Sequence, residues 1–247
     1  MHIFLQVLLM MLSVIPAFAQ EPENDDFVEV EYINFNIAEN PLDRIPSYRD
    51  RRFEYGSLFS VSYNQFIPRN YDPQYSASSY SDVYEDLAVG SIEVSASFKY
   101  NFSLGSISAG IGVGIVSSES SNIAAHGDSL LKLYPIRGEV NLALDNLFDN
   151  PVFVPYGIAG VYTVIFHEEL AALAYDGNTQ VAPYFGGGVL YRLDWLFPNE
   201  SFNAYKENGQ ENTFIYLEGR KFVASTKPAD PDFSTGIQFG GGLKFEF

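Results

Sequence analysis

Apolar and polar residues alternate along eight segments of this chain, with the period of two that is typical of β-strands. Within residues 88–102, Ile92 and Phe98 fall on one face, and Glu93 and Lys99 fall on the other. Each segment is long enough to cross a bilayer as a tilted strand. The eight segments are residues 53–66, 88–102, 106–116, 133–144, 152–166, 181–193, 212–224 and 236–247.

The connections between the segments alternate in length and polarity. The turns at 103–105 and 145–151 are short, whereas the connections that alternate with them are longer or polar. This asymmetry predicts an all-β fold, an eight-stranded antiparallel up-and-down transmembrane β-barrel with long outer loops and short periplasmic turns. The connection 194–211 is the exception, being long on the predicted periplasmic side. The expected outer loops are residues 67–87, 117–129, 168–180 and 225–232.

The two faces of the predicted strands differ in the size of their residues. The less apolar faces carry mostly Gly, Ser, Ala and Thr, which suit the crowded interior of a narrow barrel better than a solvated surface. The apolar faces are therefore predicted to point outward. Aromatic residues near segment ends are expected to form the interfacial girdle of a membrane barrel. They are Phe53, Tyr55, Tyr100, Phe102, Tyr156, Tyr184, Trp195, Phe245 and Phe247.

Charged residues on the predicted inner faces form the sharpest candidate site. When the strands are threaded alternately down and up, five of these residues lie at similar depth, about five to nine residues from the periplasmic turn of each strand. Buried charges are tolerated when they are paired, and this set contains both signs. We therefore predict a layer of salt bridges that fills the lumen. The layer comprises Glu93, Arg137, Glu139, Glu218 and Arg220.

The ends of the chain and its composition narrow the class of protein. Residues 1–19 have the pattern of a signal peptide, residues 20–50 that of an acidic N-terminal tail, and residues 51–247 that of the barrel. The absence of cysteine excludes a disulfide framework and a thiolate metal site. A formal net charge of −17 argues against nucleic-acid binding, which requires a basic surface. We expect no cofactor.

Together these features resemble the eight-stranded outer-membrane β-barrel family of OmpA-like and OmpW-like type, over residues 53–247. The strand starts "VPYGIAGV" and "APYFGGGV" are similar to the family's Pro-Tyr-x-x-Gly-x-Gly pattern, and the chain ends in "GLKFEF". That ending looks like the signal read by the barrel assembly machinery, with Gly242, Phe245 and Phe247 in its key positions, although its polar position falls on Gly240. The resemblance implies the outer membrane of a Gram-negative-type bacterium and says little about activity.

Three further patterns are candidate sites. "GIGVG" at 110–114 lacks the G-x-G-x-x-G spacing and following helix of a dinucleotide loop, so its glycines are expected to serve close packing in the barrel. His126 and His167 lie near the expected outer rim, where a lipid-modifying triad is conceivable with neighbouring Ser and acidic residues. The outer-loop acids show no calcium-loop spacing and are expected to be solvated. The neighbours of the histidines are Ser129, Asp128, Glu168 and Glu169. The outer-loop acids are Asp82, Glu85, Asp86, Glu119, Glu168, Glu169 and Asp176.

The sequence thus favours a non-enzymatic barrel of structural or surface-interaction type, because eight strands enclose only enough space for side chains. The expected partners are outer-membrane lipid or lipopolysaccharide, the barrel assembly machinery, and a surface or periplasmic protein. Three alternatives stay open: a narrow channel or transporter for small apolar compounds, a lipid-modifying enzyme, and a soluble β-sandwich or lipocalin-like binder.

Overall fold

The computed structural model describes residues 46–73, 80–84, 90–120, 129–170, 173–228 and 230–247. Residues 46–247 form one compact unit. The predicted signal peptide and residues 20–45 of the predicted tail lie outside the described residues. No helix in the described part of the chain is both long and apolar enough to cross a membrane.

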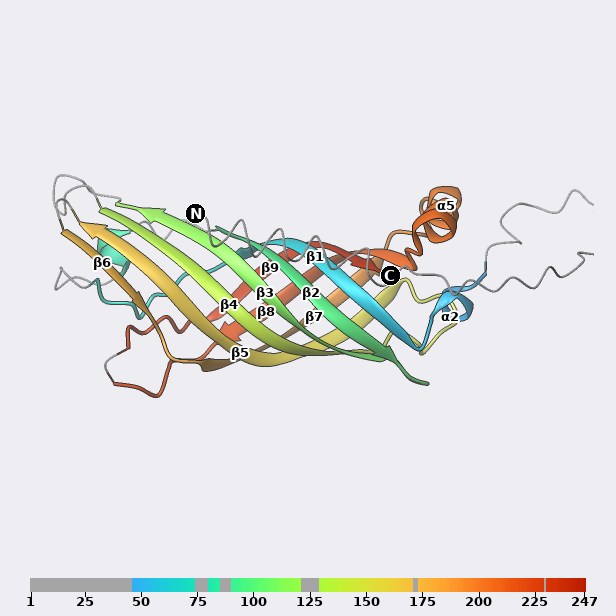
Figure 1. Cartoon of the computed structure of the whole chain (residues 1–247), viewed down its shortest axis with the longest axis horizontal. Helices are drawn as coiled ribbons and strands as arrows, with labels where there is room; N and C mark the ends of the chain where they lie inside the picture. The colour runs from blue at the N-terminus through green and yellow to red at the C-terminus, as the bar shows by residue number, and fades with distance from the viewer. Residues whose placement is uncertain (1–45, 74–79, 85–89, 121–128, 171–172, 229) are drawn as a thin grey trace, which may run out of the picture. The chain divides into compact units, whose positions relative to one another are not determined.

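Within the described residues, nine antiparallel strands form one sheet, and eight of them close into a barrel (Figure 1). Consecutive strands pair along the chain, and closure comes from the pairing of the first strand with the last, over Leu58–Asn64 and Gly240–Glu246. The predicted fold class, an eight-stranded antiparallel barrel, is confirmed. Its strands are β1 (Tyr55–Gln65), β2 (Gly90–Asn101), β3 (Ser106–Glu119), β4 (Ser129–Ala143), β5 (Phe153–Leu170), β7 (Ala182–Arg192), β8 (Asn212–Phe222) and β9 (Ile237–Glu246).

The ninth strand corrects one prediction. Residues 168–180 were expected to be a loop, but β5 extends to Leu170 and β6 (Leu173–Asn178) pairs back onto it from Leu170 to Ile165. The mixed polar and apolar sequence of this segment hides the hairpin, because it lacks the alternation that marks the barrel strands.

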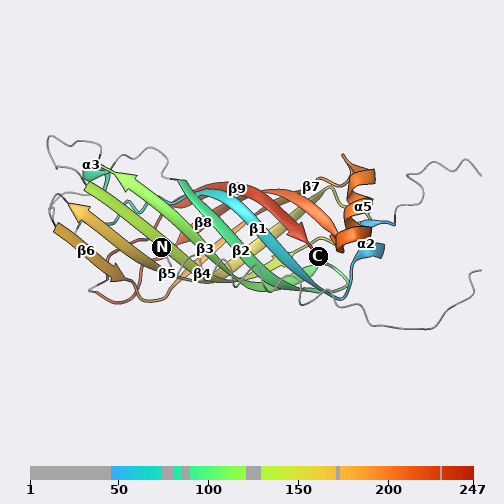
Figure 2. The same cartoon turned by 45° about the horizontal axis from the view of Figure 1, so that its top comes forward.

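Two helices and the short turns lie at one end of the barrel, which we call the turn end. Figures 1 and 2 place α2 (Tyr48–Arg51), α5 (Pro198–Asn208) and the C-terminus there, and α3 (Tyr80–Val83) and β6 at the opposite end, the loop end. Helix α5 accounts for the long connection 194–211. It begins at Pro198 and ends before Gly209, whose φ of 67° provides the left-handed conformation that terminates helices.

The burial pattern of the barrel is the inverse of that of a water-soluble sheet protein. Large apolar side chains are exposed on the outer wall, as at Ile92 (63%), Leu217 (70%) and Phe239 (66%). Polar residues at alternate positions, such as Ser62 and Asn141, are buried inside. The prediction that the apolar faces point outward is therefore correct.

Candidate functional site

The five charged residues predicted to share one level in the lumen belong to one connected network of ion pairs. Arg137 Nη2 donates to Glu93 Oε2 at 2.7 Å, and Arg137 Nη1 donates to Glu139 at 3.2 Å. Arg220 Nη1 donates to the same Glu93 oxygen at 2.6 Å. Arg220 also pairs with Glu218. Since β2 and β8 are not hydrogen-bonded neighbours, the contact of Glu93 with Arg220 spans the interior.

Glycines of the intervening strand make room for this network. Arg137 on β4 reaches Glu93 on β2 by passing over β3. A Cβ atom added at Gly112 would lie 2.9 Å from Arg137 Nη2, and one at Gly114 would lie 3.0 Å from Glu93 Cγ. The "GIGVG" glycines therefore allow the close approach that the ion pairs need.

Two tyrosines assigned to the interfacial girdle lie in the lumen instead. Tyr156 and Tyr184 are 7% and 1% exposed. The Tyr156 hydroxyl donates to Glu218 at 2.9 Å, and the Tyr184 hydroxyl donates to Glu139 at 2.7 Å. Their rings occupy positions at which the strand alternation points inward, and their hydroxyls satisfy carboxylates that would otherwise be costly to bury.

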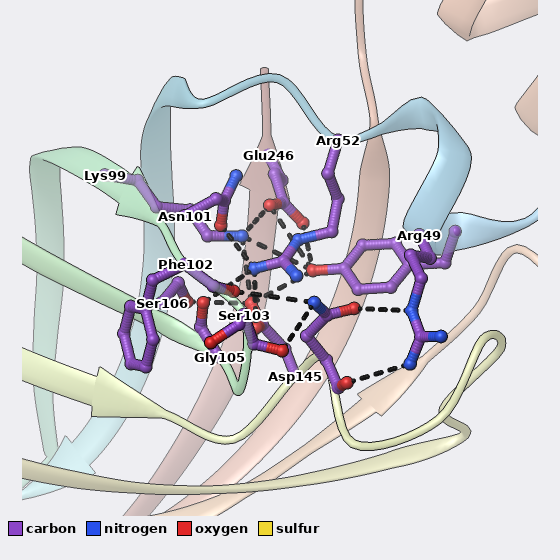
Figure 3. Close-up of polar contacts among 12 residues, drawn as sticks. Arg49, Arg52, Lys99, Asn101, Phe102, Ser103, Gly105, Ser106, Asp145 and Glu246 are labelled. Carbon is purple, nitrogen blue, oxygen red and sulfur yellow. Dashed lines mark hydrogen bonds and ion pairs between the residues drawn. The ribbon is translucent and has the colours of Figure 1, made fainter.

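A second polar cluster, which the sequence did not predict as a site, closes the turn end (Figure 3). Asp145, in the turn after β4, accepts from Arg52 at 2.8 Å, Lys99 at 3.0 Å, Ser106 at 2.7 Å and Tyr48 at 3.0 Å. Asp145, Arg52 and Lys99 are almost fully buried. We call this group, together with Glu246, the turn-end cluster.

The penultimate residue of the chain completes the turn-end cluster. Glu246 is fully buried on the inner face of β9 and pairs with Lys99. Its carboxylate also accepts from Tyr48 at 3.3 Å and from Asn212 at 3.4 Å. One carboxylate thus links the last strand to β2, β8 and the segment that precedes β1.

Helix α2 lies over the turn end and is tied down from both of its ends. Arg51 donates to Asp194 at 3.2 Å and to Ser201 of α5 at 3.3 Å. Arg49 pairs with Asp149 at 2.5 Å in a more exposed setting. The compact unit begins at Pro46, and residues 46–53, which include the last residues of the segment assigned to the tail, form what we call the cap of the barrel.

A buried carboxyl pair sits beneath this cap. Glu211 and Glu246 are both fully buried, and the Glu211 backbone N–H donates to the Glu246 carbonyl at 2.8 Å. The Phe53 N–H donates to Glu211 Oε1 at 3.0 Å. Burial, followed by the nearby Glu246 charge, raises the pKa of Glu211 to about 7. Glu211 is therefore a group that changes charge near neutral pH.

Aromatic side chains fill the lumen at the loop end. Tyr71 stacks on Phe233 at 4.8 Å between ring centroids, and Phe166 lies 5.3 Å from Phe233. Below them, Phe222 contacts further rings on β5 and β7. The fully or almost fully buried members of this layer are Phe66, Tyr71, Tyr80, Tyr84, Phe166, Phe222 and Phe233.

One carboxylate anchors the loop-end layer. Glu168, expected in a solvated loop, is only 1% exposed and faces inward from β5. The hydroxyls of Tyr71 and Tyr84 each donate to it at 2.9 Å. Burial and the Glu168 charge raise the pKa of both tyrosines, so the phenols stay protonated and keep donating.

A cavity of about 20 Å³, room for about one water, adjoins the turn-end cluster, and Lys99, Asp145 and Glu246 are among the residues that line it. Lys244 lines it, with its ammonium 4.9 Å from the Tyr156 ring centroid and 5.1 Å from that of Tyr216. Within the described chain Lys244 has no ion-pair partner. The central network contains three carboxylates and two guanidiniums, so Lys244 offsets its excess negative charge.

The rim residues considered as a catalytic triad are not brought together. His126 and Asp128 lie outside the described residues. Ser129 is buried, and its Oγ contacts no histidine in the parts of the chain described here. His167 lies on the outer face of β5, where its nitrogens contact Asp176 at 2.5 Å and Glu169 at 2.7 Å.

The contacts of His167 with Asp176 and Glu169 make no recognisable catalytic site. The described residues contain no group of three or more metal-ligating side chains placed to hold an ion. Of the other acids assigned to loops, Asp82 lies in α3 and Glu119 ends β3, whereas Glu85 and Asp86 fall outside the described residues.

The residues of the expected assembly signal lie on β9 and at its end. Gly242 faces inward, and a Cβ there would meet the Val61 carbonyl oxygen at 2.1 Å. Phe245 faces outward opposite Phe59. Phe247 forms the last rung of barrel closure, since its N–H donates to the Ser57 carbonyl at 2.9 Å and its carbonyl accepts from Ser57 at 2.7 Å.

No protein-family model and no curated protein sequence matches the chain. Its fold is similar to solved structures of bacterial surface proteins at low sequence identity. The attachment invasion locus protein Ail of Yersinia pestis has 9% identity and a TM-score of 0.40, covering 78% of this chain and 97% of that chain. Neisserial surface protein A has 12% identity and a TM-score of 0.38, covering 78% and 94%. The outer membrane protein OprG of Pseudomonas aeruginosa has 13% identity and a TM-score of 0.43, covering 80% and 98%. Such likeness concerns the fold and says nothing of individual residues.

Proposed function

We propose that this chain is a transmembrane barrel of a bacterial outer membrane, with a structural or surface-interaction role and a lumen closed by its own side chains. The outer wall supports the membrane location. Its exposed large apolar residues would be unfavourable in water, whereas a bilayer matches them and leaves every backbone group of a closed barrel paired. The same wall counts against the soluble alternatives.

The observation that carries the closed-lumen proposal is the central ion-pair network. A solute crossing the barrel would have to separate Glu93 from Arg137 and Arg220, which are all buried and mutually paired. Exposing one buried partner without the other is strongly unfavourable. The loop-end aromatic layer and the turn-end cluster close the lumen at two further levels. A channel function is therefore less favoured than a structural or surface-interaction role.

Electrical recording in planar bilayers tests this proposal. We expect purified protein, folded as judged by heat-modifiable migration, to insert without producing stable conductance steps. A variant with Glu93, Arg137 and Arg220 all changed to Ser serves as a reference in which the central closure is missing. Stable steps from the unaltered protein, matching those of the triple variant, would favour the narrow channel instead.

An enzymatic role is not part of the proposal. The one described histidine at the rim, His167, contacts two carboxylates and no serine or other nucleophile in the described chain. Incubation with outer-membrane lipids is expected to release no acyl chains. Release that is lost in a His167→Gln variant would revive the lipid-modifying alternative.

The outer loops are the surface on which we place the interaction role. They connect the strands at the loop end, and a rigid barrel is a scaffold that displays such connections. Lipopolysaccharide, a surface protein or a periplasmic protein at the N-terminal tail are the partners that fit this arrangement. Binding of the folded protein to intact cells or envelope extracts, compared with a variant whose loop 225–232 is replaced by Gly and Ser, would test the loop-mediated part.

A further inference from the structure

A cleft of about 430 Å³ opens on the barrel near the loop end. It exists because β8 ends at Phe222 whereas its partner β9 begins at Ile237, so the chain between them leaves the sheet. Nine residues line the cleft: Asn70, Phe185, Lys221, Phe222, Val223, Ala224, Ser234, Thr235 and Gly236.

The cleft joins an apolar surface to a polar rim. Phe185 on β7 and Ile237 on β9 flank Lys221 from its two sides on the outer wall, and Phe239 lies one outward position further along β9; all three apolar side chains are more than half exposed. Lys221 is the last outward-facing residue of β8. The cleft therefore lies where an apolar band meets a positive charge.

The polar groups of the rim can donate hydrogen bonds to an anion. Lys221 has no ion-pair partner among the residues that the structure describes. Ser234 Oγ accepts from Asn70 at 2.9 Å, which leaves the Ser234 hydroxyl hydrogen able to donate elsewhere. None of the nine lining residues is acidic, although the chain has 31 Asp and Glu against 14 Lys and Arg. The lining of the cleft therefore carries one positive charge, that of Lys221, and this charge complements a negative ligand.

A second outward-facing lysine near the same end, Lys132, lies in different surroundings from Lys221. Lys132 lies opposite His167 on the β4–β5 ladder, and Glu169 is two residues away on the same outer face. It has carboxylates nearby and does not line the cleft. Lys132 is therefore a matched control for Lys221.

We propose that the cleft binds a phosphorylated acyl lipid of the surrounding leaflet. The phosphate lies against Lys221 and Ser234, and the acyl chains run on the two sides of Lys221, one along Phe185 and the other along Ile237 and Phe239. A headgroup-sized volume beside a continuous apolar wall fits such an amphipathic ligand, and a charge at the end of the apolar band matches the depth of lipid phosphates. This inference rests on the proposed membrane location.

Native mass spectrometry of the detergent-folded protein tests the site. The probes are dioleoyl phosphatidic acid, dioleoylglycerol, which lacks the phosphate, and inorganic phosphate, which lacks the acyl chains. We expect one phosphatidic acid to be retained in preference to dioleoylglycerol. Lys221→Gln should weaken that binding by roughly fivefold, the size of one partly exposed charge-assisted contact, whereas Lys132→Gln should change it by less than about twofold.

A second pair of variants tests whether the lipid needs the volume of the cleft, in addition to the charge of Lys221. A Cβ added at Gly236 or at Gly157 meets nothing within 4 Å, but only Gly236 lines the cleft. Gly236→Leu should therefore displace the lipid, by roughly fivefold or more, and Gly157→Leu should not. Each variant is first shown to keep heat-modifiable migration, so that loss of binding is not loss of fold.

Other results of these experiments would overturn either the lipid site or the membrane location. Equal retention of phosphatidic acid and dioleoylglycerol, or equal loss in the Lys132 and Lys221 variants, overturns the proposed site. Displacement of phosphatidic acid by an equimolar amount of inorganic phosphate shows a soluble-anion site and also overturns it. Failure of the protein to insert into phosphatidylcholine vesicles counts against the membrane location itself, whereas insertion without selective lipid binding counts against the cleft alone.

Discussion

The central network and the turn-end cluster both bury several charges in the lumen, but they are built from different kinds of chain. The central network takes all five residues from strands, whose alternation and register fix which side chains meet. The turn-end cluster takes Asp145 from a turn and Arg52 and Tyr48 from the segment before β1. Lys99, Ser106 and Glu246 come from strands, and Ser106 is the first residue of its strand.

The two closures differ in how they are attached to the barrel. The central network cannot open without separating buried ion pairs between strands of the wall. Residues 46–53 are held by a few backbone hydrogen bonds and by side-chain contacts that include the buried ion pairs of Arg51 and Arg52, and they can separate without unpairing any strand of the wall, so we expect the cap to open first. We therefore regard the central network as the permanent closure and the cap as the removable one.

The largest effect is expected from a change that prevents both regions from forming. Phe247→Asp places a charge at the last rung of the β1–β9 closure, in an outward position expected at the membrane interface. Most of the protein should then fail to reach the outer membrane in its heat-modifiable form. Phe247→Tyr keeps an amphipathic ring there and should assemble normally. Wild-type outer-membrane levels of the Asp variant would contradict the assigned role of this residue.

The next largest effect should come from the shared acceptor of the central network. Glu93→Gln leaves the guanidiniums of Arg137 and Arg220 without their common carboxylate, which we expect to lower the free energy of unfolding by about 3–5 kcal/mol. Urea unfolding in micelles, followed through the single Trp195, measures it. Glu119→Gln, at an exposed position, should cost less than about 0.5 kcal/mol. Equal effects of the two substitutions would mean that the network contributes little.

The central network can be predicted from the sequence better than the turn-end cluster, because its residues all lie on strands. The inward positions of Glu93, Arg137 and Arg220 follow from a period of two, and their common level follows from counting residues along paired strands. Local alternation therefore contains the information needed for the central network. The inward faces of Lys99 and Glu246 are equally visible in the alternation.

Their partners at the turn end are not visible in the same way. Asp145 and Arg52 have no strand register, so only the folded chain shows that they meet. Tyr156 and Tyr184 were misplaced because an aromatic residue near a strand end fits a girdle and a lumen equally well, and only the strict alternation decides. The hairpin of β5 and β6 was missed because residues 168–180 carry mixed polar and apolar side chains without a clear period.

The cap should also respond to pH, through Glu211. Its pKa is about 7 in the folded protein against 4.5 for the ordinary side chain, because of burial and of Glu246. The folded protein therefore binds this proton more tightly, so the free energy of unfolding falls as the pH rises from about 4.5 to about 7 and this contribution is constant above that.

Glu211→Gln isolates this contribution from other titrating groups. Between pH 5 and pH 8 the unaltered protein should lose roughly 2–3 kcal/mol more than the variant, the order expected for a shift of this size. Lys99 and the Phe53 N–H favour the charged form of Glu211 and are unchanged by the substitution. Parallel pH profiles for the two proteins would show that Glu211 titrates normally and that the cap is not pH-sensitive.

The smallest effects should distinguish two of the three arginines that hold the cap, Arg52 and Arg49. Arg52→Gln removes a buried partner of Asp145, which still has Lys99, Ser106 and Tyr48, so we expect a loss of about 2 kcal/mol. Arg49→Gln removes the exposed pair with Asp149 and should cost less than about 0.5 kcal/mol. Limited proteolysis after Arg44 and near Arg49, with urea unfolding in parallel, would detect release of the cap before loss of the barrel. If Arg52→Gln destabilises the whole barrel as much as Glu93→Gln does, the cap is not separable from the wall, and the distinction between a removable and a permanent closure fails.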